Sequence, residues 1–176
     1  MAPSDNDPKA VKKPRRWWRY ALELLLILAL FWAFKSWLER DMLSGPAPPL
    51  HGTLVNGTAF NLEDYRGEAV LVYFWASWCG VCRVAQNGIQ AVAADWPVIT
   101  IAMQSGDVYR VMAYLREHEL DFPVLLDEHG ELAAQFGVSA VPASFIIDPH
   151  GNIRYRERGY TSSLGLRARL WLAQWR

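Results

Sequence analysis

The longest apolar stretch of the chain lies close to its N-terminus. Residues 17–38 are mostly apolar, and as one helix they would extend about 33 Å, enough for the roughly 30 Å hydrocarbon layer of a membrane. Glu23 and Lys35 interrupt the run, but each lies near an end, where a charged group reaches the membrane surface. Trp17 and Trp37 at the two ends match the aromatic belts of spanning helices. The pattern predicts a transmembrane helix over residues 17–38.

Short apolar runs farther along the chain have the length and composition of buried strands. The first is AVLVYFWA at residues 69–76, which is rich in β-branched and aromatic residues. Apolar positions at helical spacing follow it, between Cys82 and Trp96. The pattern predicts an α/β domain with helices on both faces of a central sheet. We expect the strands of this sheet at residues 69–75, 98–103, 143–147 and 152–158.

The C-terminal segment has the pattern of a final helix. Thr161 or Ser162 provides the N-cap side chain, and four later residues share one helical face. These residues are Leu164, Ala168, Trp171 and Trp175. We expect this face to pack into the core with its tryptophans, and Trp75 to be a packing residue as well.

The chain is predicted to contain four segments. A basic arm at residues 1–16 precedes the span at 17–38, a proline-rich linker occupies residues 39–50, and residues 51–176 form the working domain. Six lysines and arginines lie within residues 9–19 and few follow the span closely, so the N-terminus is expected in the cytoplasm and the domain outside. A cleaved signal peptide and a surface-lying or core helix remain alternative interpretations.

Charge and cysteine content narrow the possible functions. The 18 lysines and arginines balance 18 aspartates and glutamates, which argues against a nucleic-acid partner. Only two cysteines occur, Cys79 and Cys82, so a scaffold of several disulfides is excluded, and a redox pair or half of a metal site remains. The four histidines are scattered singly, without the paired spacing of structural zinc ligands. We therefore expect no metal site.

The cysteines lie where the predicted strand at residues 69–75 turns into a helix. Cys79 falls near the N-terminus of this helix, where unpaired N–H groups and the helix dipole stabilise a thiolate. We therefore predict that Cys79 is the nucleophile. Cys82, three residues later on the same helical face, is placed to attack the mixed disulfide formed on Cys79 and release the partner. An inert buried pair or a static disulfide is the alternative.

The sequence FWASWCGVC at residues 74–82 resembles the thioredoxin superfamily, specifically its membrane-anchored TlpA/ResA/DsbE-like branch. The segment SAVPASF at residues 139–145 extends this resemblance. It implies a thioredoxin fold with a central mixed sheet, and a cis proline at Pro142 beside the cysteines. Val141 and Pro142 are then expected to contact the substrate, which could add as an extended strand. The neighbours of the cysteines, Trp78, Gly80 and Val81, complete the expected substrate-binding residues.

The resemblance covers most of the domain, from about residue 61 to residue 152. A helix at residues 107–119 and a short strand at residues 122–126 resemble an insertion of this branch. The C-terminal end is most similar to ScsD-type proteins of bacterial suppressor-of-copper-sensitivity systems. Tyr73 and Ala85 depart from the pattern, because they occupy positions where thioredoxins or members of this branch place an aspartate or a glutamate. No proton acceptor is therefore carried over.

These observations predict a membrane-tethered thiol–disulfide oxidoreductase in the bacterial inner membrane, with a single span and a periplasmic catalytic domain. We expect it to exchange disulfides with protein partners, as a reductant supplied by a membrane electron donor of DsbD/ScsB type. No cofactor beyond a redox-active Cys79–Cys82 disulfide is expected. Two other functions remain open: a copper(I)-binding or copper-delivery module, because thiolates suit Cu(I), and a tethered interaction module with a vestigial motif.

Overall fold

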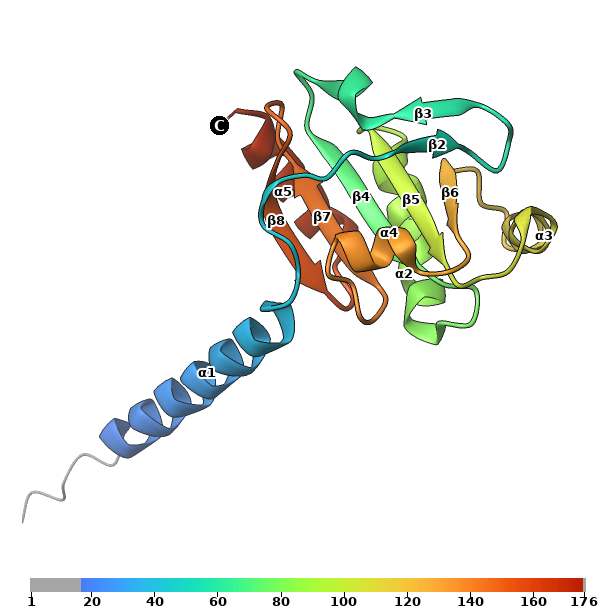
Figure 1. Cartoon of the computed structure of the whole chain (residues 1–176). Helices are drawn as coiled ribbons and strands as arrows, with labels where there is room; N and C mark the ends of the chain where they lie inside the picture. Colours follow the sequence, from blue (N-terminus) through green and yellow to red (C-terminus); the bar gives the residue numbers. More distant parts are fainter. Residues whose placement is uncertain (1–16, 176) are drawn as a thin grey trace, which may run out of the picture. The chain divides into compact units, whose positions relative to one another are not determined.

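A computed structural model describes residues 17–175 of the chain (Figure 1). The basic arm predicted at residues 1–16 lies outside the described residues. The chain divides into two units, one ending at Trp37 and the other beginning at Leu38, and each is described by itself.

Helix α1 (Trp17–Glu39) covers the predicted apolar run, and its residues 17–37 are the described part of the first unit. Leucine and alanine, both strong helix formers, dominate its middle. Its segment Trp17–Phe34 is long and apolar enough to cross a membrane and is not buried within the protein. The helix is therefore confirmed, and its insertion into a membrane stays a prediction.

A six-stranded mixed sheet forms the centre of the second unit (Figure 1). Its strands, in spatial order, are β1 (Gly45–Pro46), β8 (Asn152–Arg158), β7 (Ala143–Ile147), β4 (Val70–Trp75), β5 (Val98–Met103) and β6 (Val124–Asp127). Strand β4 pairs parallel with β5 and antiparallel with β7, and β5 pairs parallel with β6. A hairpin of β2 (His51–Thr53) and β3 (Ala59–Asn61) forms a separate small sheet. The four strands predicted at residues 69–75, 98–103, 143–147 and 152–158 are present as β4, β5, β7 and β8.

Strand β4 is buried on both faces, which explains its continuous apolar sequence. Leu71, Tyr73 and Trp75 belong to the buried cluster on one face. The helices α2 (Gly80–Ala93), α3 (Val108–Glu117) and α5 (Ser163–Gln174) contribute to the same cluster. Val72 and Phe74 belong to the opposite cluster, to which the short helix α4 (Glu131–Gln135) contributes. The sheet is therefore a rigid layer between two cores, and both ends of β4 are held in place.

Part of the segment predicted as a linker, residues 39–50, is folded against the sheet. Gly45 and Pro46 form β1 and pair with β8. Met42 and Leu50 are both buried in the cluster opposite α2. The prolines of this segment suit an edge strand, where one side of the backbone needs no partner.

The expectation that the tryptophan face of α5 packs into the core is wrong. Ser162 caps the helix as predicted, because its hydroxyl accepts a hydrogen bond from the Gly165 N–H at 3.2 Å. Trp171 and Trp175, however, are 58% and 74% exposed. Leu164 and Ala168 on the same face are exposed as well. The core is instead contacted by Leu166, Leu170 and Ala173. Two faces of this helix are apolar, and helical periodicity alone does not determine which of them packs.

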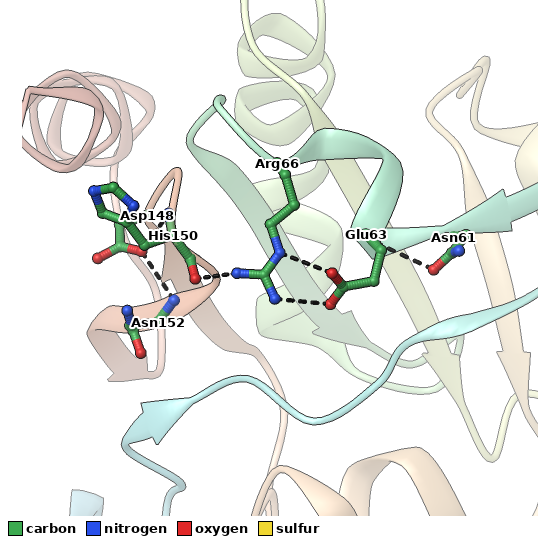
Figure 2. Close-up of polar contacts among 6 residues, drawn as sticks. All are labelled: Asn61, Glu63, Arg66, Asp148, His150 and Asn152. Carbon is green, nitrogen blue, oxygen red and sulfur yellow. Dashed lines mark hydrogen bonds and ion pairs between the residues drawn. The ribbon is translucent and has the colours of Figure 1, made fainter.

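An arginine clamp closes the end of the sheet where β4 begins (Figure 2). Arg66 follows the 3₁₀ turn at Leu62–Tyr65 and forms a bidentate ion pair with Glu63, with N–O distances of 2.8 and 2.9 Å. Its remaining terminal nitrogen donates to the carbonyl oxygen of His150 in the β7–β8 turn. Asp148 stabilises that turn by accepting the backbone N–H of His150 at 2.9 Å. The clamp joins the segment before β4 to the turn after β7.

Candidate active site

A tight turn joins the end of β4 to the start of α2 and carries Cys79. The Cys79 N–H donates to the carbonyl oxygen of Ala76 at 3.1 Å, so Ser77 and Trp78 are the central residues of a β-turn. Cys79 has an extended backbone and is the N-cap of α2, where its sulfur accepts the Cys82 N–H at 3.1 Å. The helix-end position expected from the sequence is therefore present.

Cys79 and Cys82 are joined by a disulfide in this structure, with their Cα atoms 5.3 Å apart. Cys82 is completely buried, whereas Cys79 keeps 8% of its surface exposed. An external sulfur therefore reaches Cys79 more readily than Cys82. The N-terminus of α2 and the N–H of Cys82 would both stabilise a negative charge on the Cys79 sulfur once the disulfide is opened.

Val141 and Pro142 lie beside the cysteines because β7 is the antiparallel neighbour of β4. The start of β7 and the end of β4 consequently meet at the same edge of the sheet. The Val141–Pro142 bond is cis, as the resemblance implies. The Cys79 sulfur lies 3.7 Å from the carbonyl oxygen of Val141. Val141 is half-buried and Pro142 is buried, so the accessible part of this segment borders the exposed side of Cys79.

The other predicted substrate contacts form an accessible rim around Cys79. Trp78 is 62% exposed and Val81 is 52% exposed, and Gly80 between them is exposed too. The structure thus places the predicted site residues at one edge of the sheet. Their roles in binding and catalysis remain predictions.

Buried polar side chains lie near Cys82, and the sequence pattern did not identify them as site residues. Tyr73 belongs to the same buried cluster as Cys82, and among the described residues its hydroxyl has no hydrogen-bond partner. Burial, and to a smaller extent the neighbouring Tyr114, raises the pKa of the Tyr73 hydroxyl well above its ordinary value. Gln86, one turn after Cys82, is buried and accepts the Tyr114 hydroxyl at 3.0 Å. A single buried tyrosine has no pattern in the sequence that distinguishes it from a packing residue.

Across residues 17–175, no group of three or more histidine, cysteine, aspartate or glutamate residues is arranged to hold a metal ion. Neither the described residues nor the relatives described next support the copper alternative.

The chain is similar in sequence to a known protein family and to several characterised proteins. The model of the AhpC/TSA family matches residues 43–156. The thiol-disulfide oxidoreductase ResA of Bacillus cereus (strain ATCC 10987 / NRS 248) is 27% identical over 165 residues, covering 85% of this chain and 91% of ResA. The thiol:disulfide interchange protein DsbE homolog of Paracoccus denitrificans (strain Pd 1222) is 33% identical over 156 residues, covering 80% of this chain and 87% of the homolog.

The chain is also similar to a solved structure of a protein of the same kind. A crystal structure of a thiol:disulfide interchange protein, a thioredoxin family protein of Chlorobium tepidum TLS, matches with a TM-score of 0.67 and 26% identity. The match covers 75% of this chain and 97% of that protein. The thioredoxin-type α/β fold expected from the sequence is thereby confirmed.

Proposed function

Because the chain belongs to the AhpC/TSA family of thioredoxin-like proteins, we propose that it is a membrane-tethered reductant of protein disulfides. Its class, thiol–disulfide oxidoreductase, is that of its relatives. The observation that carries the proposal is the position of Cys79, which caps α2 next to Val141 and is the more exposed of two bonded cysteines. Cys79 and Cys82 are the proposed catalytic residues.

The reaction starts from the reduced pair. The Cys79 thiolate attacks one sulfur of a substrate disulfide, forms a mixed disulfide and releases the other substrate sulfur as a thiolate. Cys82 then loses its proton and attacks the Cys79 sulfur, which forms the Cys79–Cys82 disulfide and releases the second substrate thiolate. Two electrons pass to the substrate, and no cofactor other than the cysteine pair takes part.

Substrate binding uses the edge formed by Val141 and Pro142. An extended peptide that lies along this segment would bring its cysteine close to the Cys79 sulfur. The exposed surface of Trp78, Gly80 and Val81 borders the same place and supplies the remaining contacts. Protein disulfides with an exposed, extended cysteine segment are therefore the proposed substrate class.

Helix α1 supports the proposed tether. The basic residues ahead of it keep the N-terminus in the cytoplasm, so the domain lies in the periplasm on a single span of the bacterial inner membrane. A membrane electron donor of DsbD/ScsB type re-reduces the pair in this scheme. The resemblance of the C-terminal end to ScsD-type proteins favours a place in a copper-tolerance system.

Equilibration of the full-length protein in detergent with glutathione buffers tests the direction of electron flow. A midpoint potential near that of thioredoxin, about −270 mV, is expected for a reductant. A potential near that of the strong oxidant DsbA, about −120 mV, would reverse the proposed direction. Replacing Cys79 with serine should abolish the titration altogether.

A further inference from the structure

The loop that follows β5 holds the turn that carries Cys79. Strands β4 and β5 are parallel neighbours, so the segments after them leave the sheet at the same edge. Two residues of the β5–α3 loop, Gln104 and Ser105, contact the two central residues of the Ala76–Cys79 turn. Neither belongs to the cysteine motif or to the segment around Pro142.

Ser105 supports the first central residue of the turn. Its side-chain oxygen accepts the backbone N–H of Ser77 at 3.0 Å and donates its own proton to the carbonyl oxygen of Met103 at 3.1 Å. Because its proton is used within the loop, the lone pairs of the oxygen are directed toward Ser77. Ser105 is only 6% exposed, so water competes little for this contact.

Gln104 supports the second central residue through its backbone. Its carbonyl oxygen accepts the indole N–H of Trp78 at 3.1 Å. The residue has a φ of +48°, a left-handed conformation that is unfavourable for a residue other than glycine. Its own N–H donates to the carbonyl oxygen of Asp127 at the end of β6, at 2.8 Å. Strained backbone persists where the surrounding structure enforces it, and here the bonds to Asp127 and Trp78 fix both sides of Gln104.

We propose that Ser105 and Gln104 are positioning residues of the active site, which fix the Ala76–Cys79 turn so that Cys79 and Val141 engage one substrate segment together. The inference rests on the proposed function of Cys79. The hydrogen bonds of the Cys79 sulfur are made with Val141 and Cys82, and not with these two residues. Both act by restraining Ser77 and Trp78, the residues that lead into Cys79.

The proposal distinguishes two kinds of substrate. A protein disulfide has to contact the Val141 segment and the Cys79 sulfur at once, so its reaction depends on their relative position. A small disulfide such as glutathione disulfide needs access to the sulfur alone. Loss of the Ser105 hydroxyl should therefore slow reaction with a protein disulfide and affect the small disulfide much less.

The test compares the reduced full-length protein and its Ser105→Ala variant in detergent. Rates are measured with insulin as the protein disulfide and with glutathione disulfide. We expect Ser105→Ala to lower kcat/KM for insulin about fivefold, the rate equivalent of one ordinary hydrogen bond, and to change the glutathione disulfide rate less than twofold. Ser105→Thr, which keeps the hydroxyl, should restore most of the insulin rate. Ser162→Ala is the matched control, since it removes a serine hydroxyl that accepts a backbone N–H on α5.

Equal slowing of both substrates by Ser105→Ala, or no slowing of either, would overturn the positioning role. Failure of the proposed function gives a different result, because the unchanged protein would then reduce neither disulfide. Hydrogen exchange of the Ser77 amide provides a second readout that needs no catalysis. Exchange should accelerate about fivefold or more in Ser105→Ala, and an unchanged exchange rate would also contradict the proposal.

Discussion

The Cys79 sulfur lies 3.7 Å from the carbonyl oxygen of Val141, although the two residues are 62 positions apart in the sequence. Strand pairing produces this contact: β4 leads into Cys79, β7 follows Val141, and the two strands are antiparallel neighbours. Cys82 lies behind Cys79 and is fully buried. From this arrangement we predict different roles for two chemically identical side chains.

The first prediction concerns these roles. Cys82→Ser should accumulate mixed disulfides between Cys79 and partner proteins, because attack on the partner proceeds and release does not. Cys79→Ser should accumulate none, since the remaining sulfur is inaccessible. Non-reducing electrophoresis of the membrane fraction measures both. Faster alkylation of Cys82 than of Cys79 in the reduced protein would show that the roles are reversed.

The second prediction concerns the topology of the chain. The apolar length of α1 and the basic residues before it predict that the intact protein stays in the membrane with its C-terminus in the periplasm. A reporter that is active only in the periplasm, fused after Arg176, should be active. The same fusion with a reporter active only in the cytoplasm should be silent. A mature protein that begins near residue 45 would indicate a cleaved signal peptide instead of an anchor.

The third prediction concerns the stability contribution of Tyr73. Its hydroxyl is buried without a hydrogen-bond partner in the described part of the chain, and a buried unpaired hydroxyl costs about 1 kcal/mol or more. Tyr73→Phe should therefore raise the free energy of unfolding at neutral pH by about 1 kcal/mol. Urea unfolding of the full-length protein measures this change, and a loss of stability would reveal a partner for the hydroxyl.

Tyr73 should also make the free energy of unfolding depend on pH, with a sign that follows from its raised pKa. Burial raises the pKa of Tyr73 above its ordinary value of 10. Above that pH the unfolded chain loses the proton while the folded protein retains it, so the free energy of unfolding falls as pH rises. Below pH 10 the folded and the unfolded chain both keep this proton, so the ionisation of Tyr73 does not lower the free energy of unfolding there. Tyr73→Phe should flatten the decline in alkali, which unfolding curves at neutral and alkaline pH would detect.

Much of the fold was predictable because the sheet is covered on both faces. The apolar runs at residues 98–103 and 143–147 coincide with β5 and β7, since strands between two cores need uninterrupted apolar sequence. The strand expected at residues 152–158 coincides with β8, which is mostly polar and only partly buried. The position of the cysteines followed from the same pattern, because the end of β4 and the start of α2 are both local features of the chain.

The parts that were not predicted depend on contacts between distant segments. Trp171 and Trp175 share a helical face, but whether that face is buried depends on how α5 lies on the sheet. The support of Trp78 by Gln104 uses a backbone carbonyl group, which every residue possesses and no sequence pattern marks. Ser105, buried under the active-site turn, resembles any loop serine in the sequence.

The last prediction concerns proton transfer to and from Cys82. Ala85 lies one turn after Cys82 on the buried face of α2 and is 4% exposed, so neither it nor Tyr73 offers a carboxylate. Asp95 has a carboxylate, but it follows the far end of α2 and is paired with Arg167 at 2.5 Å. With no carboxylate at Ala85 or Tyr73, we expect Cys82 to lose its proton to water or to the departing thiolate. Release of the mixed disulfide should therefore accelerate with rising pH toward the range of thiol ionisation and show no acidic inflection.

Ala85→Glu should speed this release near neutral pH, because it places a carboxylate on the Cys82 side of the helix. Val84→Glu is the matched control: Val84 is 73% exposed, so the same charge enters on the solvent side and should change the rate little. Stopped-flow measurement of release between about pH 5 and pH 9 compares the three proteins across the carboxylate and thiol ranges. Suppose the unchanged protein shows an inflection in the carboxylate range that disappears when one acidic residue is neutralised. That residue would then be the base, and Cys82 would not depend on water.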